Sequence, residues 1–186
     1  RFVLDDGWFA GRRDDTAGLG DWTVDPDVWP GGLTPLVDHV RDLGMEFGLW
    51  VEPEMVNPDS ELARSHPEWI LRGRADLPPS ARQQQVLNLA HPGAYRYISE
   101  RLHALLEEYP IAYLKWDHNR DLVDAAAGPG GAARVHATTL ALYRLLDELK
   151  AAHPALEIES SASGGARVDL GILDRTDRIW TSDSLD

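Results

Sequence analysis

Short apolar runs alternate with longer amphipathic stretches along most of this chain, and the alternation constrains the fold more than any other feature of its 186 residues. Apolar residues recur at helical spacing after Thr34, Pro92 and Val135. Six short apolar runs predict buried strands of the parallel type, at residues 2–4, 47–51, 86–89, 111–114, 156–159 and 178–181. Strands that alternate with helices predict a parallel α/β architecture.

Local signals place some of the element boundaries. Thr34 is expected to cap the first helix, with Pro35 in its first turn and Gly44 at its end. The glycines and proline of residues 128–131 predict a loop. Because neither an internal repeat nor a domain boundary stands out, we expect a single domain.

Charge and composition exclude several kinds of partner. Asp and Glu number 31 against 18 Lys and Arg, a formal charge of −13 that would repel a nucleic acid backbone. No apolar run approaches the roughly 18–20 residues needed to span a bilayer, so we expect no membrane partner. The lack of cysteine excludes disulfides and thiolate metal sites and favours a reducing, cytoplasmic compartment. The chain opens on Arg1 and enters an apolar segment at once, so the natural N-terminus is expected to be missing.

Polar clusters follow five of the six apolar runs. In a parallel barrel the carboxyl ends of the strands open on one face, where active sites lie. Tryptophans stand beside these clusters, and an aromatic face next to carboxylates suits a sugar ring, which has apolar faces and hydroxyl edges. The side chains expected to converge at the strand ends are Asp5, Asp6, Trp50, Glu52, Glu54, Asp117 and Asp183.

Each cluster also has a structural interpretation. Residues 5–7, Asp-Asp-Gly, are typical of a tight turn, and Lys115 with Asp117 is typical of a structural ion pair. Residues 160–165 resemble a phosphate-binding loop but lack the lysine of a Walker motif. The seven histidines show neither His-x-His nor His-Glu-x-x-His spacing, so they predict no metal site. Carboxylates at the strand ends leave Mg²⁺ open as an alternative.

Five segments carry a family resemblance and occur in order from one end of the chain to the other. They are Asp5-Asp6-Gly7-Trp8-Phe9, Gly48 to Met55, Tyr113 to Arg120, Ser163 to Asp169, and Trp180-Thr181-Ser182-Asp183. Together they closely resemble the family-36 α-galactosidases of the glycoside hydrolases. One such motif would be a weak signal, whereas five collinear motifs are specific.

The resemblance implies a (β/α)8 TIM-type barrel that cleaves terminal α-linked galactose with retention, from oligosaccharides such as melibiose and raffinose. It implies no cofactor and no metal. Six strands would make about six of the eight β/α units of such a barrel, so residues 1–186 are expected to form a partial catalytic barrel domain. The β-rich domains that flank the family barrel are absent from the chain, and a homo-oligomeric parent protein is left open.

The same resemblance implies the roles of individual residues. Asp117, in the Lys-Trp-Asp motif, corresponds to the nucleophile. Asp183, in the Trp-x-Ser-Asp motif, corresponds to the acid/base, with Asp186 as a competitor for that role. Ser161 stands where many relatives have a cysteine, a departure expected to affect preference at the 2-position of the sugar. Substrate contacts are implied for Asp5, Asp6, Trp50, Arg82, Lys115, Asn119, Ser161 and Gly164.

Retaining chemistry explains why these residue types are needed. Two carboxyl groups about 5–5.5 Å apart must flank the scissile bond, one as nucleophile and one as acid and then base. Asp117 and Asp183 are far apart in the sequence, so only a fold that gathers strand ends can pair them. Lys115, two residues before Asp117, lies on the same side of a strand, and we expect its charge to hold Asp117 ionised.

Alternatives on the same scaffold stay open at this point. An α-N-acetylgalactosaminidase, or a raffinose or stachyose synthase that transfers galactose, would use a similar pocket. A non-catalytic sugar-binding relative is a third alternative, which the presence of both carboxylates disfavours. The partner expected in every case is an oligosaccharide, with an α-galactoside favoured.

Overall fold

The computed structural model describes residues 1–185 and shows an α/β fold built on a parallel sheet. The sheet has five strands in the order β1-β2-β5-β6-β7, and each neighbouring pair is parallel. Spatial order therefore follows chain order. The strands are β1 (Phe2–Leu4), β2 (Phe47–Val51), β5 (Ile111–Trp116), β6 (Glu157–Ser160) and β7 (Arg178–Ile179).

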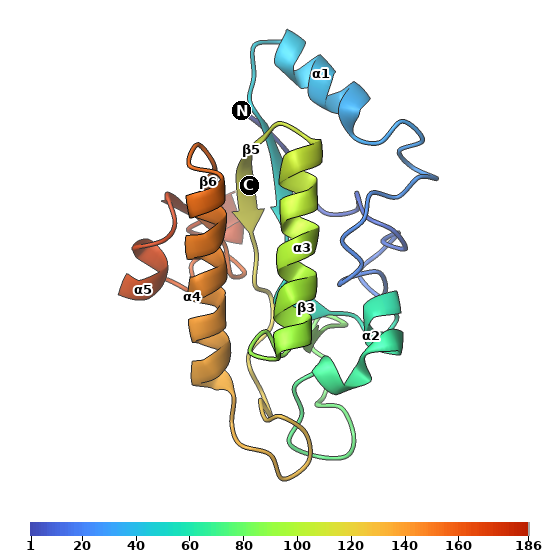
Figure 1. Ribbon diagram of the computed structural model, residues 1–186, viewed down its shortest axis with the longest axis vertical. Coiled ribbons are helices and arrows are strands. Elements are labelled where there is room, and N and C mark those ends of the chain that lie inside the picture. The colour runs from blue at the N-terminus through green and yellow to red at the C-terminus, as the bar shows by residue number, and fades with distance from the viewer. Residues whose placement is uncertain (186) are drawn as a thin grey trace.

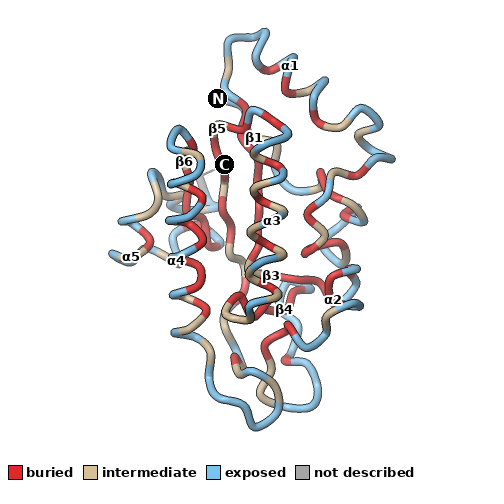
Figure 2. Tube along the Cα trace, viewed as in Figure 1, coloured by how far each residue is buried: buried red, intermediate tan, exposed pale blue. Residues whose placement is uncertain are grey.

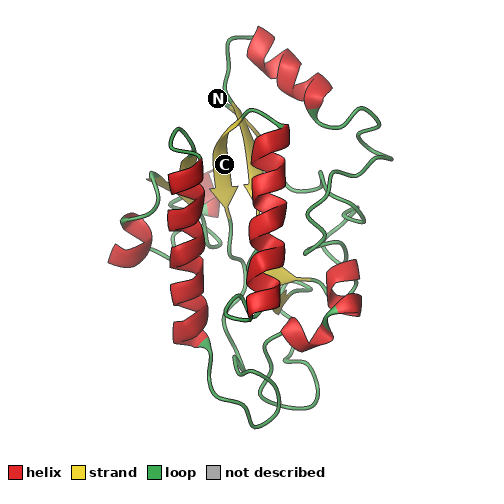
Figure 3. Cartoon of the chain, in the orientation of Figure 1, coloured by secondary structure: helices red, strands yellow, loops and turns green. Residues whose placement is uncertain are grey.

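Helices connect these parallel strands, as the helical periodicity predicted. In Figure 1 the two long helices α3 and α4 stand side by side over one face of the sheet, and Figure 3 shows the same layering. The helices are α1 (Thr34–Asp42), α2 (Glu61–Ser65), α3 (Pro92–Glu108), α4 (Val135–Ala152) and α5 (Leu170–Leu173), with short 3-10 turns η1 (Pro67–Trp69) and η2 (Asp183–Leu185). Among residues 1–185, no helix is long and apolar enough to cross a membrane.

The prediction of six parallel strands is wrong at residues 86–89. Only β4 (Gln85–Val86) forms there, and it pairs antiparallel with β3 (Met55–Val56) in a separate two-stranded sheet. The main chain of Leu87 donates to Glu54 O, just beyond the end of β2. The run is thus buried against a loop, and burial alone could not distinguish that setting from a central strand.

The first helix begins at Thr34, one residue earlier than predicted. Leu33 occupies the cap position and no side chain caps the helix, so Thr34 is already helical and the capping role predicted for it is wrong. Pro35 lies in the first turn as predicted. Gly44, at φ +72°, adopts the left-handed conformation that ends the helix, which confirms the predicted stop.

The core lies between the sheet and the helices, and the buried positions in Figure 2 follow both elements. All five residues of β2 are buried, as expected for a strand covered on both faces. An aromatic group lies at the carboxyl end of β2, where the Trp8 indole donates to the backbone oxygen of Trp50 at 2.9 Å. This packing fixes the end of β2 and the residues that follow it. A closed eight-stranded barrel stays a prediction beyond the five-stranded sheet.

Candidate active site

A small cavity of about 200 Å³ opens where β1, β2 and β5 end. Its volume suits a ligand smaller than a typical drug molecule, such as one monosaccharide unit. Six of the ten predicted site residues line it, but the convergence expected from the sequence is wrong for Glu54 and Asp183, which are not among the lining residues. The lining residues are Asp5, Asp6, Arg12, Asp15, Trp50, Glu52, Arg82, Gln84, Asp117 and Asn119.

Asp117 is a carboxylate of this cavity that three donors hold in place. Its backbone N–H donates to Val51 O at 2.8 Å, which continues the pairing of β5 with β2 and places the side chain at the strand end. One carboxylate oxygen accepts from Trp50 Nε1 at 3.1 Å and from Asn119 Nδ2 at 2.5 Å. The other accepts from the backbone N–H of His118 at 3.0 Å. Three donors stabilise the negative charge of a carboxylate and fix its orientation.

Lys115 makes its ion pair with Asp5 rather than with Asp117. Its Nζ lies 2.8 Å from Asp5 Oδ2 and 5.1 Å from the centre of the Trp180 ring. Burial lowers the pKa of Lys115, but the charges of Asp5, Asp117 and Glu159 outweigh it, and the pKa is raised overall. The cation therefore acts on Asp117 across space rather than by direct contact.

Asp6 is held by Arg12, a residue that the sequence analysis missed. Arg12 Nε and Nη2 donate to the two oxygens of Asp6 at 3.0 and 2.7 Å, a fork that fixes the carboxylate plane. Arg12 is buried, and its remaining amino group donates to Asn57 Oδ1 at 3.1 Å. The backbone also bends here, with Gly7 at φ +97°, so the segment has both a structural and a site role.

Arg82 reaches the loop that follows β6 through Ser163, a second residue that the sequence analysis missed. Arg82 Nη1 donates to Ser163 Oγ at 3.3 Å. Ser163 in turn donates to Asn119 Oδ1 from its backbone N–H at 3.1 Å and from Oγ at 2.9 Å. The side-chain amide of Asn119 thus accepts from Ser163 through its oxygen and donates to Asp117 through its nitrogen. The network orients Asn119 toward the carboxylate.

Asp183 lies outside the group that lines the cavity. It is exposed, and its Oδ1 accepts from Trp180 Nε1 at 3.0 Å. The segment that carries Asp183 packs against Gly164. A Cβ at Gly164 would lie 2.9 Å from Ser182 Cα, so only glycine lets the two chain segments approach. Ser161 is buried beside this loop. Among residues 1–185, the lining of the cavity does not include Asp183, Ser161, Gly164 or Lys115. Asp186, the competing candidate for the acid/base, lies outside the described residues.

Glu52 was expected from the sequence to lie at the strand ends, and the structure confirms that position, but no role in the site was predicted for it. It is fully buried and lines the same cavity as Asp117. Its Oε1 accepts from the backbone N–H of Asn119 at 2.5 Å, and its Oε2 accepts from Gln84 Nε2 at 2.9 Å. Burial and the neighbouring charge of Asp117 raise the pKa of Glu52 to about 8, against the pull of the two donors. The position of Glu52 after a strand could be predicted from the sequence, but the lack of a cationic side chain paired with it could not.

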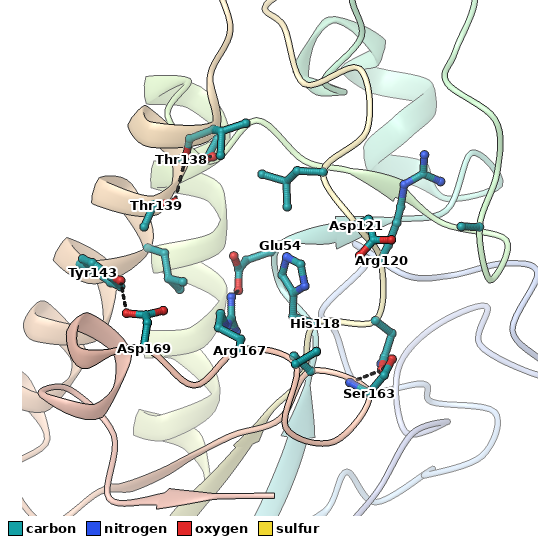
Figure 4. Close-up of a pocket in the computed structure, with 17 residues that line it drawn as sticks. Glu54, His118, Arg120, Asp121, Thr138, Thr139, Tyr143, Ser163, Arg167 and Asp169 are labelled. Carbon is teal, nitrogen blue, oxygen red and sulfur yellow. Dashed lines mark hydrogen bonds and ion pairs between the residues drawn. The ribbon is translucent and has the colours of Figure 1, made fainter. Parts of the chain in front are cut away.

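Glu54 points to the other side of the same segment, into a separate cavity of about 460 Å³ (Figure 4). There it forms an ion pair with Arg167 Nη1 at 2.6 Å and accepts from Trp116 Nε1 at 3.0 Å. Burial raises the pKa of Glu54, but the charges of Arg167 and His118 outweigh it, and the pKa is lowered overall. In residues 1–185, no group of three or more His, Asp or Glu side chains is placed to hold a metal ion.

Comparisons with known proteins bear on this geometry. The melibiase family model matches residues 1–186. The chain is 54% identical to the α-galactosidase of Escherichia coli, a match that covers 100% of the chain and 26% of that protein. The crystal structure of the family-36 α-galactosidase AgaB from Geobacillus stearothermophilus matches with 44% identity and a TM-score of 0.94, over 100% of the chain and 26% of that structure.

A second solved structure is that of a substituted AgaA from Geobacillus stearothermophilus in complex with raffinose. It matches with 41% identity and a TM-score of 0.91, over 99% of the chain and 26% of that structure. The chain thus spans 26% of the length of each of these relatives.

Proposed function

The chain belongs to the melibiase family, and we propose that it carries the catalytic centre of a retaining α-galactosidase. The observation that carries the proposal is Asp117, a carboxylate held by three donors in a cavity of monosaccharide size. A nucleophile needs this arrangement, because its charge is stabilised and its approach to the sugar is fixed before substrate arrives.

In the proposed reaction Asp117 attacks the anomeric carbon and forms a glycosyl-enzyme while the leaving oxygen receives a proton. Asp183 is proposed as the group that gives this proton and then takes one from water. The close approach of Gly164 to Ser182, and the position of Lys115 over Trp180, support a place for Asp183 beside the cavity. The two carboxyl groups would then stand about 5–5.5 Å apart around the bound sugar.

The proposed substrate is an α-galactoside oligosaccharide, in keeping with the raffinose bound by a relative. Asp5 and Asp6 have free lone pairs beside their ion pairs and are proposed to accept from galactose hydroxyls. The other proposed contacts are Trp50, Arg82, Lys115, Asn119, Ser161 and Gly164. We also propose that the sheet is part of a complete (β/α)8 barrel with β-rich domains at its flanks. A cytoplasmic location and a homo-oligomeric state stay predictions.

The roles of the two aspartates are tested by azide rescue in the full-length protein. Asp117→Ala should lower hydrolysis of p-nitrophenyl α-galactoside by at least about 1,000-fold. Azide should restore turnover and give the β-galactosyl azide, because it replaces the nucleophile on the β face. Asp183→Ala with azide should instead give the α-galactosyl azide, because azide then attacks the glycosyl-enzyme from the α face.

Asp42→Ala on the exposed end of α1 is the matched control and should hydrolyse the substrate at the parental rate. Unchanged hydrolysis by Asp117→Ala would rule out its assignment as nucleophile. The N-acetyl counterpart of the substrate tests the other family activity. A higher kcat/KM on that sugar than on the galactoside would make the protein an α-N-acetylgalactosaminidase instead.

A further inference from the structure

We propose that Glu52 is a positioning residue of this centre that works in its protonated form, tying residues 117–119 to the end of β2 without adding a second charge beside Asp117. The proposal rests on the proposed function, since it concerns the same cavity. It goes beyond that function because Glu52 would act through Asn119 rather than on the sugar.

The geometry links Glu52 to the nucleophile in two steps. Glu52 Oε1 accepts from the Asn119 backbone N–H at 2.5 Å, and the Asn119 side chain donates to Asp117 Oδ2 at 2.5 Å. The main chain and side chain of Asn119 are thus anchored on different carboxyl groups. Because Asn119 follows Asp117 by two residues, holding its backbone fixes the short segment on which the nucleophile is carried.

The charges around Glu52 favour an uncharged carboxyl. Three cationic groups near the cavity are engaged elsewhere: Arg12 with Asp6, Lys115 with Asp5, and Arg82 with Ser163. Asp5, Asp6, Asp15 and Asp117 line the cavity as further acidic groups, and Arg120 donates to the backbone oxygens of Gln84 and Pro79. Within residues 1–185, Glu52 forms no ion pair.

The resulting protonation state follows from burial. A buried carboxylate without a cation is costly, so the group keeps its proton instead. The pKa of Glu52, raised to about 8 by burial and by Asp117, agrees with a proton retained at neutral pH.

Gln84 offers an acceptor for this proton. Its Oε1 is buried without a hydrogen-bond partner, while its Nε2 faces Glu52 Oε2 at 2.9 Å. The two ends of an amide are nearly alike in shape, so a half-turn of the group would present Oε1 to a protonated Glu52. The pair would then be joined by an O–H···O hydrogen bond rather than by an N–H facing a carboxylate.

The test compares two replacements in the full-length protein. Glu52→Gln keeps the shape and the lack of charge, so its kcat on p-nitrophenyl α-galactoside should stay within about threefold of the parent. Glu52→Leu loses both acceptors, and its kcat should fall at least about tenfold with a smaller change in KM. A Glu52→Gln variant as inactive as Asp117→Ala would overturn the proposal, and so would a fully active Glu52→Leu.

Infrared spectroscopy supplies a readout that needs no activity. The parent at neutral pH should show a protonated-carboxyl band that disappears in Glu52→Gln. The band should persist in Glu54→Gln, because the Glu54 carboxyl is ionised in its pair with Arg167 and does not contribute to it. A spectrum without this difference would overturn the proposal even in an active enzyme. If the band is present but the full-length protein does not cleave galactosides, the protonated state of Glu52 is supported and the proposed function is wrong.

Discussion

Glu52 and Glu54 lie two residues apart, the first fully and the second largely buried, yet they take opposite electrostatic roles. Glu54 has Arg167 at 2.6 Å and a lowered pKa, whereas Glu52 has only neutral donors, the charge of Asp117 nearby, and a raised pKa. Burial is common to both residues, so the partner decides the protonation state. One side of the segment serves the proposed chemistry, and the other secures the structure.

Two tryptophans repeat this division. Trp50 donates to Asp117 in the small cavity, and Trp116 donates to Glu54 on the other side, at similar distances of 3.1 and 3.0 Å. They come from neighbouring strands β2 and β5, whose side chains alternate between the two faces of the sheet. The pairs Trp50–Asp117 and Trp116–Glu54 therefore allow matched experiments on the two faces.

The largest expected effect comes from removing the cation of Glu54. Arg167→Met should lower the free energy of unfolding by about 3–5 kcal/mol, because it leaves a buried carboxylate unpaired. Urea denaturation of the full-length protein measures the change. Arg64→Met, which removes an exposed pair with Asp59, is the control and should cost no more than about 1 kcal/mol. Equal losses in the two variants would show that Glu54 does not depend on its cation.

The second effect is a pH dependence of stability that belongs to Glu52. Its pKa is raised on folding, so its contribution is fully present below the unfolded pKa of about 4.3 and is lost as pH rises toward about 8. Relative to Glu52→Gln, the parent should lose about 4 kcal/mol of unfolding free energy between these values. The pH dependence that Glu54 contributes has the opposite sign, because its pKa is lowered on folding and its contribution to stability is lost as pH falls. A constant difference between parent and Glu52→Gln at all pH values would contradict a raised pKa.

The third effect separates the two tryptophans by activity. Trp50→Phe removes one donor from Asp117, and a hydrogen bond to a charged group contributes about 1.5–3 kcal/mol, so kcat/KM should fall about 10- to 100-fold. Steady-state kinetics on p-nitrophenyl α-galactoside measures the loss. A variant with the parental kcat/KM would mean that the remaining donors hold Asp117 without Trp50.

The smallest effect is expected on the other face. Trp116→Phe removes a donor from Glu54, but Arg167 stays in place, so the free energy of unfolding should fall by about 1 kcal/mol. Its kcat/KM should remain within about twofold of the parent, since Glu54 lies outside the small cavity. A loss of activity as large as that of Trp50→Phe would show that the two faces are coupled.

Periodicity carried most of the fold prediction. The three long amphipathic stretches and five of the six apolar runs became the helices and parallel strands that connect in chain order. The exception, β4, is short and buried against a loop, a setting that leaves the same apolar signature as a sheet. The cap was misplaced by one residue, because the backbone enters the helix at Leu33 without a capping side chain, and sequence signals locate helix ends only to within a residue or two.

The candidate site was predicted less evenly. Position at the carboxyl end of a strand was enough to gather Asp5, Trp50 and Asp117 in one cavity. The supporting residues Arg12 and Ser163 come from loops whose paths follow no periodicity, so their contacts could not be predicted. Which carboxylate takes which cation was equally hidden, as Lys115 shows by pairing across the sheet with Asp5.

The order of the strands has a consequence for how such a chain is made. From β1 to β7 each new strand of the sheet is added beside the strand that precedes it in the sheet, and none is inserted between two others. A polypeptide that leaves the ribosome amino end first can therefore extend the sheet at one growing edge while synthesis continues. Asp5 and Trp50 are translated before Asp117, so the strands that carry them are available when the proposed nucleophile emerges.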